Sequence, residues 1–327
     1  MTNETAASVG GNSAKGGKIG FWAPVTIVAF IALTLAGTYY VRLRILERHM
    51  VDAMKIGDEG TVCSLLNSWP CPLDAVCLKE TAKNENWDMT PLVWAIYTGK
   101  EDLALLAIAR GAKVQGRQGN PWTPVCWAAN HREREVVRAL LDRGADPNTA
   151  WGDVDVDHGR AWVWAMGWGM DNEVLALLLS RGLDPLRRDV GKDTPLHYAA
   201  MAGDCGSAKL LLHNGVDVNA KDNHRVTPLW YAAFGGETGM VTLLIRRGAR
   251  VDAADDRGRT PLHEAAERWR KGTCVALIES GTDVNAKDKD GKTPLALARI
   301  GDPQRKAGPS KEQDETVDVL LRHGAKE

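Results

Sequence analysis

The dipeptide Thr-Pro recurs along this chain at a fixed interval. It begins at residues 90, 123, 194, 227, 260 and 293, so its copies are 33 residues apart except for one interval of 71, which divides at Ala161 into 38 and 33. The first six units also have a glycine 21 residues after their start, at positions 111, 144, 182, 215, 248 and 281. A period of this length is typical of repeat proteins, in which stacked copies bury one continuous core.

Each copy predicts two short helices. Thr caps the first helix and Pro occupies its first turn, where a missing N–H costs little. Alanine pairs such as Ala199-Ala200 then allow neighbouring helices to approach closely. A second helix has an apolar run such as Leu210 to Leu212 and ends at the register glycine. Two such helices cannot bury their apolar faces alone, so the pattern predicts an all-α solenoid.

Residues 193–200 (Asp-Thr-Pro-Leu-His-Tyr-Ala-Ala), 258–266 (Gly-Arg-Thr-Pro-Leu-His-Glu-Ala-Ala) and 281–286 (Gly-Thr-Asp-Val-Asn-Ala) resemble ankyrin repeats. The resemblance covers about seven units over residues 86–327, with insertions at 151–160 and 302–314. Residues 42–85 are expected to form a linker and a degenerate capping repeat. The resemblance implies helix-turn-helix units with β-hairpin fingers, and a concave face of fingers and first helices that binds other proteins.

The same resemblance implies which positions contact a partner: the finger residues before each Thr and the two residues after the paired alanines. In the first five clear units this set is strongly aromatic, and in the last two it is basic. The predicted partner-binding residues are Trp87, Met89, Tyr97, Trp122, His131, Asp157, His158, Trp168, Met201, His224, Phe234, Arg257, Arg259 and Arg268.

Large aromatic side chains on a rigid surface are typical of protein-binding hot spots. The alternative is that such rings pack between repeats. We expect core packing for Trp164 and Trp230, which replace the histidines His197 and His263 of other units. For Trp87, Trp122, Trp168 and Phe234 the sequence leaves both roles open. The basic end could be a solvated face, or it could attract an acidic partner or anionic lipid.

A charge-free segment near the N-terminus predicts a membrane span. Residues 19–41 contain no charged side chain, and 21 of these residues would form a helix of roughly 31 Å, which is long enough to cross a bilayer. Aromatic residues lie at both ends of the segment, as is typical of membrane interfaces. Residues 1–18 have the composition of a disordered tail. The alternative is a cleaved signal peptide ending near Ala36.

The side of the membrane on which the repeats lie is left open by the sequence. Lys15 and Lys18 precede the segment, whereas three arginines follow it, which favours a cytoplasmic body by a single residue. Cys71 and Cys77 lie close together beside two prolines, so a disulfide between them in an oxidising compartment is the opposing interpretation.

Charge and motifs argue against other classes of function. A net charge of −1 does not suit binding to nucleic acid, and the chain lacks a phosphate-binding glycine loop, a nucleophile elbow and a dinucleotide fingerprint. Residues 153–158 alternate carboxylates but lack the glycine and glutamate of a calcium loop. We therefore expect no enzyme activity, cofactor, metal or small-molecule substrate. The prediction is a single-pass membrane protein that binds a partner protein as a scaffold, receptor or stoichiometric inhibitor. The alternative is a membrane-proximal structural module whose basic C-terminal repeats contact anionic lipid or acidic partners.

Overall fold

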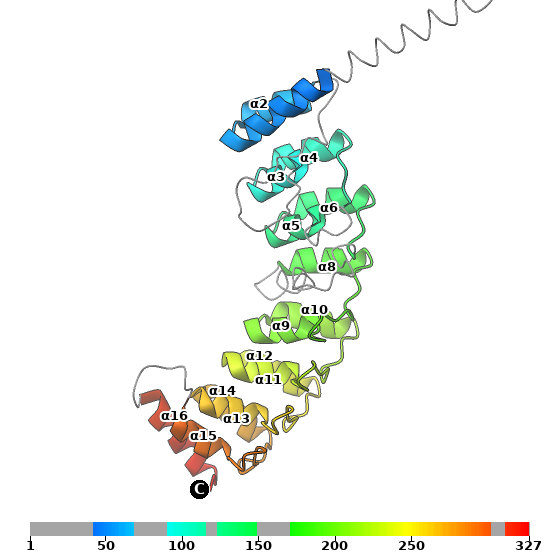
Figure 1. Cartoon of the computed structure of the whole chain (residues 1–327). Helices are drawn as coiled ribbons and strands as arrows, with labels where there is room; N and C mark the ends of the chain where they lie inside the picture. Colours follow the sequence, from blue (N-terminus) through cyan, green and yellow to red (C-terminus); the bar gives the residue numbers. More distant parts are fainter. Residues whose placement is uncertain (1–41, 69–89, 116–122, 149–170, 302–310, 327) are drawn as a thin grey trace, which may run out of the picture.

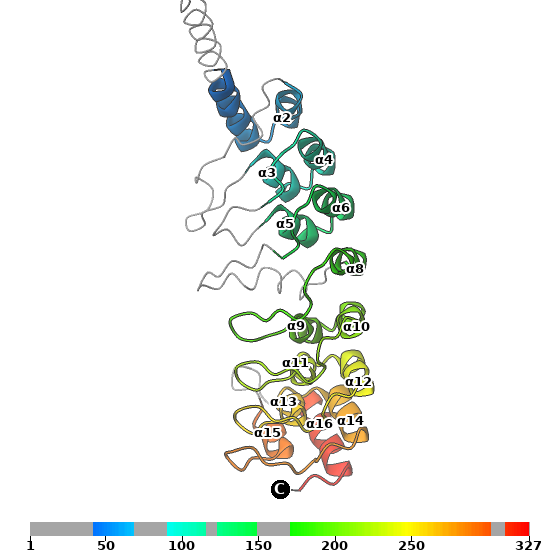
Figure 2. The same ribbon diagram turned by 90° about the vertical axis from the view of Figure 1, so that its right-hand side faces the viewer.

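The computed structural model describes residues 42–68, 90–115, 123–148, 171–301 and 311–326. These residues form helix pairs stacked in a curved column (Figure 1). Figure 2 shows three layers, with the fingers on one side of the first helices and the second helices on the other.

Residues 42–56 are helical at one end of the column. The remaining helices, in chain order, are α2 (Glu59–Leu66), α3 (Pro91–Tyr97), α4 (Glu101–Ala109), α5 (Pro124–Asn130), α6 (Arg134–Asp142), α8 (Asn172–Ser180), α9 (Pro195–Ala202), α10 (Cys205–His213), α11 (Pro228–Gly235), α12 (Thr238–Arg246), α13 (Pro261–Glu267), α14 (Lys271–Glu279), α15 (Pro294–Ile300) and α16 (Lys311–Arg322).

Every described Thr-Pro begins a first helix, as the repeat predicts. Thr90, Thr123, Thr227 and Thr293 each accept a hydrogen bond at the side-chain oxygen from the N–H three residues later, over 3.3 to 3.4 Å. Proline occupies the first turn in all of these helices. Each cap satisfies one donor that the first turn of a helix leaves unpaired.

The register glycines end the second helices. All six adopt a left-handed conformation, with φ between 83° and 91°. In that conformation a side chain costs free energy because its Cβ meets the backbone. The N–H of the next residue bonds back into the helix, as Ala249 does to the Leu244 carbonyl over 3.0 Å. The spacing of 21 residues therefore reflects the fixed length of the two helices and their turn.

One apolar core runs through the whole stack. It extends from Met50 to Ala325, and the paired alanines, such as Ala232 and Ala233, are completely buried in it. First helices pack on first helices and second helices on second helices. The helix 42–56 and α2 contribute to the same core, the former through Met50, Ala53 and Met54.

Two other sequence predictions concern the insertion 302–314 and the membrane span. Helix α16 begins at Lys311, so residues 311–314 of the predicted insertion are helical. No helix among the described residues has the length and apolarity needed to span a bilayer. The predicted span 19–41, the Cys71 and Cys77 pair and the insertion 151–160 all lie outside the described residues.

Candidate protein-binding surface

An aspartate stiffens each described finger of the C-terminal units. The Asp222 carboxylate accepts the N–H groups of His224 and Val226 over 2.8 Å each, and Asp255 does the same for Arg257 and Arg259 over 2.9 and 2.8 Å. Neighbouring fingers are also joined, because the N–H of residue 256 donates to the His224 carbonyl over 2.9 Å. The fingers therefore form a connected row that fixes the backbone of His224 and Arg257.

Three rings form a cluster at the ends of α3 and α5, which we call the N-terminal aromatic cluster. Tyr97 packs edge-on against Trp127, with ring centroids 5.4 Å apart, and His131 lies 6.2 Å from Tyr97 and 6.0 Å from Trp127. Trp127 is buried, whereas 46% of Tyr97 is exposed. Burial lowers the pKa of His131, which favours the neutral ring at pH 7. The cluster offers a supported aromatic edge to solvent.

A second group of rings lies on α11, and we call it the C-terminal aromatic cluster. Trp230 stacks on Phe234 with centroids 5.8 Å apart, and Tyr231 packs edge-on against Trp230 at 5.6 Å. The Arg268 guanidinium from the next unit lies 3.7 Å from the Phe234 ring centroid, a cation–π contact. Trp230 and Phe234 are both half-buried. The indole N–H of Trp230 is buried and has no hydrogen-bond partner among the described residues.

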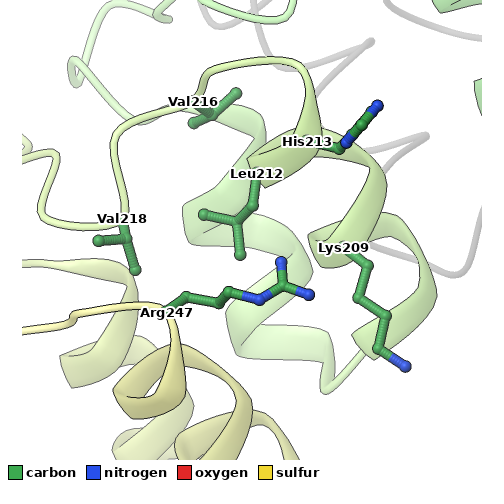
Figure 3. Close-up of a pocket in the computed structure, with 6 residues that line it drawn as sticks. All are labelled: Lys209, Leu212, His213, Val216, Val218 and Arg247. Atoms are coloured by element: carbon green, nitrogen blue, oxygen red, sulfur yellow. The ribbon is translucent and has the colours of Figure 1, made fainter.

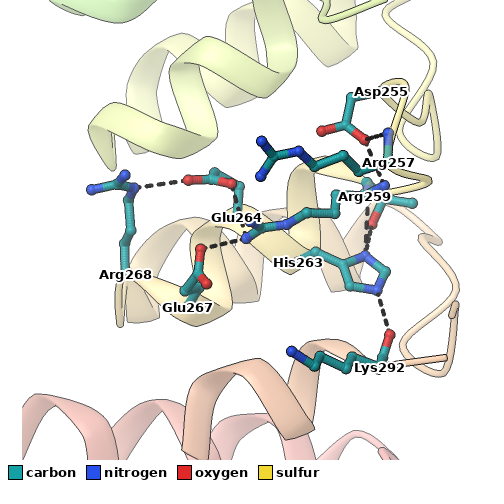
Figure 4. Close-up of polar contacts among 9 residues, drawn as sticks. Asp255, Arg257, Arg259, His263, Glu264, Glu267, Arg268 and Lys292 are labelled. Atoms are coloured by element: carbon teal, nitrogen blue, oxygen red, sulfur yellow. Dashed lines mark hydrogen bonds and ion pairs between the residues drawn. The ribbon is translucent and has the colours of Figure 1, made fainter. Parts of the chain in front are cut away.

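Beside this cluster, an ion-pair network fills the face of α13, and Figure 4 shows it. Glu264 is almost completely buried and pairs with Arg259 over 3.1 Å and with Arg268 over 2.8 Å. Arg259 also pairs with Glu267. Burial raises the pKa of Glu264 against the opposing pull of Arg268 and Arg259. The network satisfies charges that would otherwise be expensive to bury.

His197 and His263 have a structural role at the starts of α9 and α13. Each accepts the N–H of its capping Thr at Nδ1, over 2.9 Å for Thr194 and 3.1 Å for Thr260. Each Nε2 then donates to a carbonyl of the next finger, Val226 at 3.2 Å and Lys292 at 3.1 Å. This pattern requires the neutral Nε2–H tautomer, and burial lowers the pKa of both rings accordingly.

The structure describes eight of the fourteen predicted partner-binding residues, two of which, Arg259 and Arg268, belong to the ion-pair network. Tyr97, His131, Met201, His224, Phe234, Arg257 and Arg268 are exposed or half-buried. Arg259 is also half-buried, with 15% of its side chain exposed, and its guanidinium is bound by two glutamates. The other six, Trp87, Met89, Trp122, Asp157, His158 and Trp168, lie outside the described residues.

Sequence reasoning missed Trp127, Tyr231 and Trp269. The first two share one repeat position, immediately before the paired alanines, where Trp94 and Tyr198 also lie. Comparing that position between units would have revealed an aromatic column. Trp269 gave no such signal. It has a positive φ of 58° at a position where two neighbouring units have glycine. Its indole N–H donates to the Ala298 carbonyl over 2.8 Å.

The described residues hold no cluster of three or more histidine, cysteine or acidic side chains that could bind a metal ion. Cys126 and Cys274 are buried in the core, which raises the pKa of each thiol to about 12. Thiols in this state are poor nucleophiles.

Family models match most of the chain. The model described as "Ankyrin repeats (3 copies)" matches residues 50–150 and 229–326, and the model described as "Ankyrin repeat" matches residues 192–223. The chain is also similar to a solved structure, the human ASB11 ankyrin repeat domain, with a TM-score of 0.60 and 23% identity. That match covers 73% of this chain and 100% of the other, and it supports the fold.

Curated relatives match over a shorter stretch. The chain is 34% identical over 113 residues to "Ankyrin repeat, SAM and basic leucine zipper domain-containing protein 1" from Otolemur garnettii, Dasypus novemcinctus and Mustela putorius furo. The alignment covers 33% of this chain and 23% of each relative. The similarity is therefore confined to less than a quarter of those proteins.

Proposed function

The chain belongs to the ankyrin repeat family, whose repeats form protein-binding modules, and we propose that it binds its partner through the face of fingers and first helices. The observation that carries this proposal is the pair of aromatic clusters on that face. Tyr97 is 46% exposed on buried Trp127, and the half-buried Phe234 lies between Trp230 and Arg268. Aromatic and arginine side chains held by packing are what hot spots require, because little entropy is lost when they bind.

The connected fingers support the same proposal. Successive fingers bond to one another through their backbones, and an aspartate braces each tip, so His224 and Arg257 project from a fixed frame. A surface that is already ordered avoids the cost of ordering on binding. We expect the contact to be stoichiometric and non-covalent, so that the protein acts as a scaffold, receptor or inhibitor.

We further propose that residues 19–41 tether the module to a membrane. The support is the sequence alone: 23 residues without a charge, flanked by aromatic residues. Confinement at a membrane raises the effective concentration of the module near a membrane-bound partner. The protein should remain in the pellet after alkaline carbonate extraction, and deletion of residues 19–41 should release it. Release of the full chain by carbonate would contradict the tether.

Site-specific photo-crosslinking tests the binding face. A photoreactive amino acid at position 97, 201 or 234 should yield the same crosslinked partner in cells, because all three positions lie on first helices. Positions 135 and 279 are matched controls, being exposed glutamates on the second helices α6 and α14. Crosslinks from the two controls alone would place the interface elsewhere.

Affinity for the identified partner then measures the contribution of each cluster. Phe234→Ala and Tyr97→Ala should each weaken binding by about tenfold or more, as hot-spot truncations do. Glu135→Ala and Glu279→Ala should change it by less than about twofold, as residues outside an interface do. Circular dichroism of each variant checks that the repeats remain folded.

A further inference from the structure

A hollow of about 540 Å³ lies at the ends of α10 and α12, away from the fingers, and Figure 3 shows it. Its apolar part consists of Leu212, Val216 and Val218. Its polar part is entirely basic or titratable: Lys209 and His213 on α10, and Arg247 directly after α12. In Figure 3 the Arg247 side chain reaches toward α10 beneath Leu212.

An arginine follows the four second helices α4, α6, α8 and α12, and the contacts of the first three explain why Arg247 is unusual. At this position Arg110 donates to the Leu66 carbonyl over 2.9 Å, and Arg143 donates to the Ala109 carbonyl over 3.1 Å. In the next unit Arg181 pairs with the Asp142 carboxylate over 2.7 Å. Each of these arginines therefore reaches back to the end of the preceding second helix.

Arg247 lacks this partner among the described residues. The residue that corresponds to Asp142 in the preceding unit is His213, which offers no carboxylate. The side chains of Arg247 and of its neighbour Lys209 form no hydrogen bond or ion pair with any residue that the structure describes, and both are exposed. The edge thus holds two cations beside an apolar surface, whereas the equivalent arginines of three other units bond to a carbonyl or a carboxylate of the preceding second helix.

A second hollow of about 600 Å³ is lined by residues that follow those of the first along the chain. The two hollows are adjacent along the chain, because Val218 lines the first and Asn219 lines the second. Arg250 of the second hollow follows Arg247 of the first by three residues. Lys221, Arg225 and Arg250 line it. Its acidic residue, Asp252, is engaged with Thr282 and with the N–H of Asp283. Residues 209–250 contain six lysines and arginines against three acidic residues, in a chain of net charge −1.

We propose that this edge, formed by the two hollows, binds an extended acidic segment of a partner protein. An apolar side chain of the segment packs on Leu212 and Val218, and its carboxylates pair with Lys209 and Arg247. Further carboxylates follow the second hollow past Lys221 and Arg250. Charge complementarity selects this occupant, because an apolar surface beside unpaired cations favours a ligand that is both apolar and anionic. No residue of the aromatic clusters lines either hollow, so the proposal does not depend on the function proposed above, although Arg225 of the second hollow lies on a finger.

Fluorescence anisotropy with the full chain in a neutral detergent tests the proposal. The probe is a labelled peptide of aspartate and glutamate residues around two central leucines. An analogue with asparagine and glutamine tests the charge, and one with serine in place of leucine tests the apolar contact. We expect the amide analogue to bind at least about tenfold more weakly and the serine analogue about threefold more weakly. Equal binding of the acidic and amide peptides would overturn the proposal.

Charge reversal locates the site. Lys209→Glu with Arg247→Glu should weaken binding of the acidic peptide by about tenfold or more, since two attractions become repulsions. Neither side chain has a partner in the described structure, so folding should be unaffected. Lys287→Glu is the matched control, because Lys287 has the repeat position of Lys221 but lies two units further along, outside both hollows. We expect less than about a twofold change for it.

Equal losses in the double variant and the control would overturn the proposal, as would no loss in either. Vesicles of phosphatidylserine serve as the second probe. If the chain binds these vesicles but not the acidic peptide, and the double variant abolishes vesicle binding, the edge is a lipid site. That result would also overturn the proposal.

Discussion

Helices α11 and α13 occupy equivalent places in neighbouring units, yet their side chains differ in chemistry at matched positions. At three matched positions α11 has Trp230, Tyr231 and Phe234, whereas α13 has His263, Glu264 and Glu267. On α13 every one of these groups is bonded within the protein. On α11 the indole N–H of Trp230 has no partner among the described residues, and the rings stack on one another.

The difference shows that the same repeat positions can serve stability in one unit and recognition in the next. Both helices keep the Thr cap, the proline and the buried alanines, so the core does not depend on the residues that differ. The polar side chains of α13 are committed to one another and to the next finger. The aromatic side chains of α11 instead leave a surface that a partner can bury.

Removing the polar group of the residue that precedes the paired alanines should have the largest effect on the free energy of unfolding. Glu264→Leu takes the buried carboxylate from two arginines and should lower the free energy of unfolding by about 3 kcal/mol, since Arg259 and Arg268 lose a partner. Tyr231→Phe is the matched change on α11 and should cost less than about 1 kcal/mol, because its hydroxyl bonds Asp222 at a long 3.4 Å. Urea unfolding measures both. Similar losses in the two variants would contradict the comparison.

The position three residues after each Thr gives a second, smaller contrast. His263→Phe leaves the Thr260 N–H and the Lys292 carbonyl unpaired and should cost about 2 kcal/mol. Trp230→Phe removes an N–H that has no described partner, so it should change stability by less than about 1 kcal/mol. Both variants have the same new side chain, which controls for packing of the phenyl ring. A greater loss in Trp230→Phe would reverse the assignment of roles.

The change with pH in the stability that His263 contributes should be the smallest of these effects. Burial lowers the pKa of His263 below its unfolded value near 6.5, against the pull of Asp288 and with the help of Arg259. The folded state therefore binds fewer protons than the unfolded state, and the stability that neutral His263 contributes is lost as pH falls below about 6.5. The stability difference between wild type and His263→Phe should shrink from pH 7.5 to 5. A stability difference that grows as the pH falls would contradict the lowered pKa of His263 in the folded state.

Much of the fold could be predicted from the sequence because the repeat is tied to local geometry. Thr-Pro specifies where a helix begins, and the register glycine must adopt a positive φ, so the two fix the length of each unit. The burial of Cys274 followed from its register as well, because sister units have apolar residues there.

The candidate site was only partly predictable, because side-chain pairing depends on contacts across the stack. The register placed Arg259 on a finger, but it could not show that Glu264 and Glu267 converge on the guanidinium. Trp269 could not be foreseen either. Its positive φ is strained for an aromatic residue, and it is held by its bond to Ala298 and by contact at Gly301, where an added Cβ would lie 2.4 Å from the indole.

Hydrogen exchange of the full chain, with and without the crosslinked partner, tests the proposed binding face most directly. We predict that binding slows exchange in the fingers around residues 222–226 and 255–259 and at the ends of α3, α5 and α11. The second helices α4, α6 and α14 should exchange as in the free protein. Slower exchange confined to the second helices would contradict recognition through the fingers and first helices.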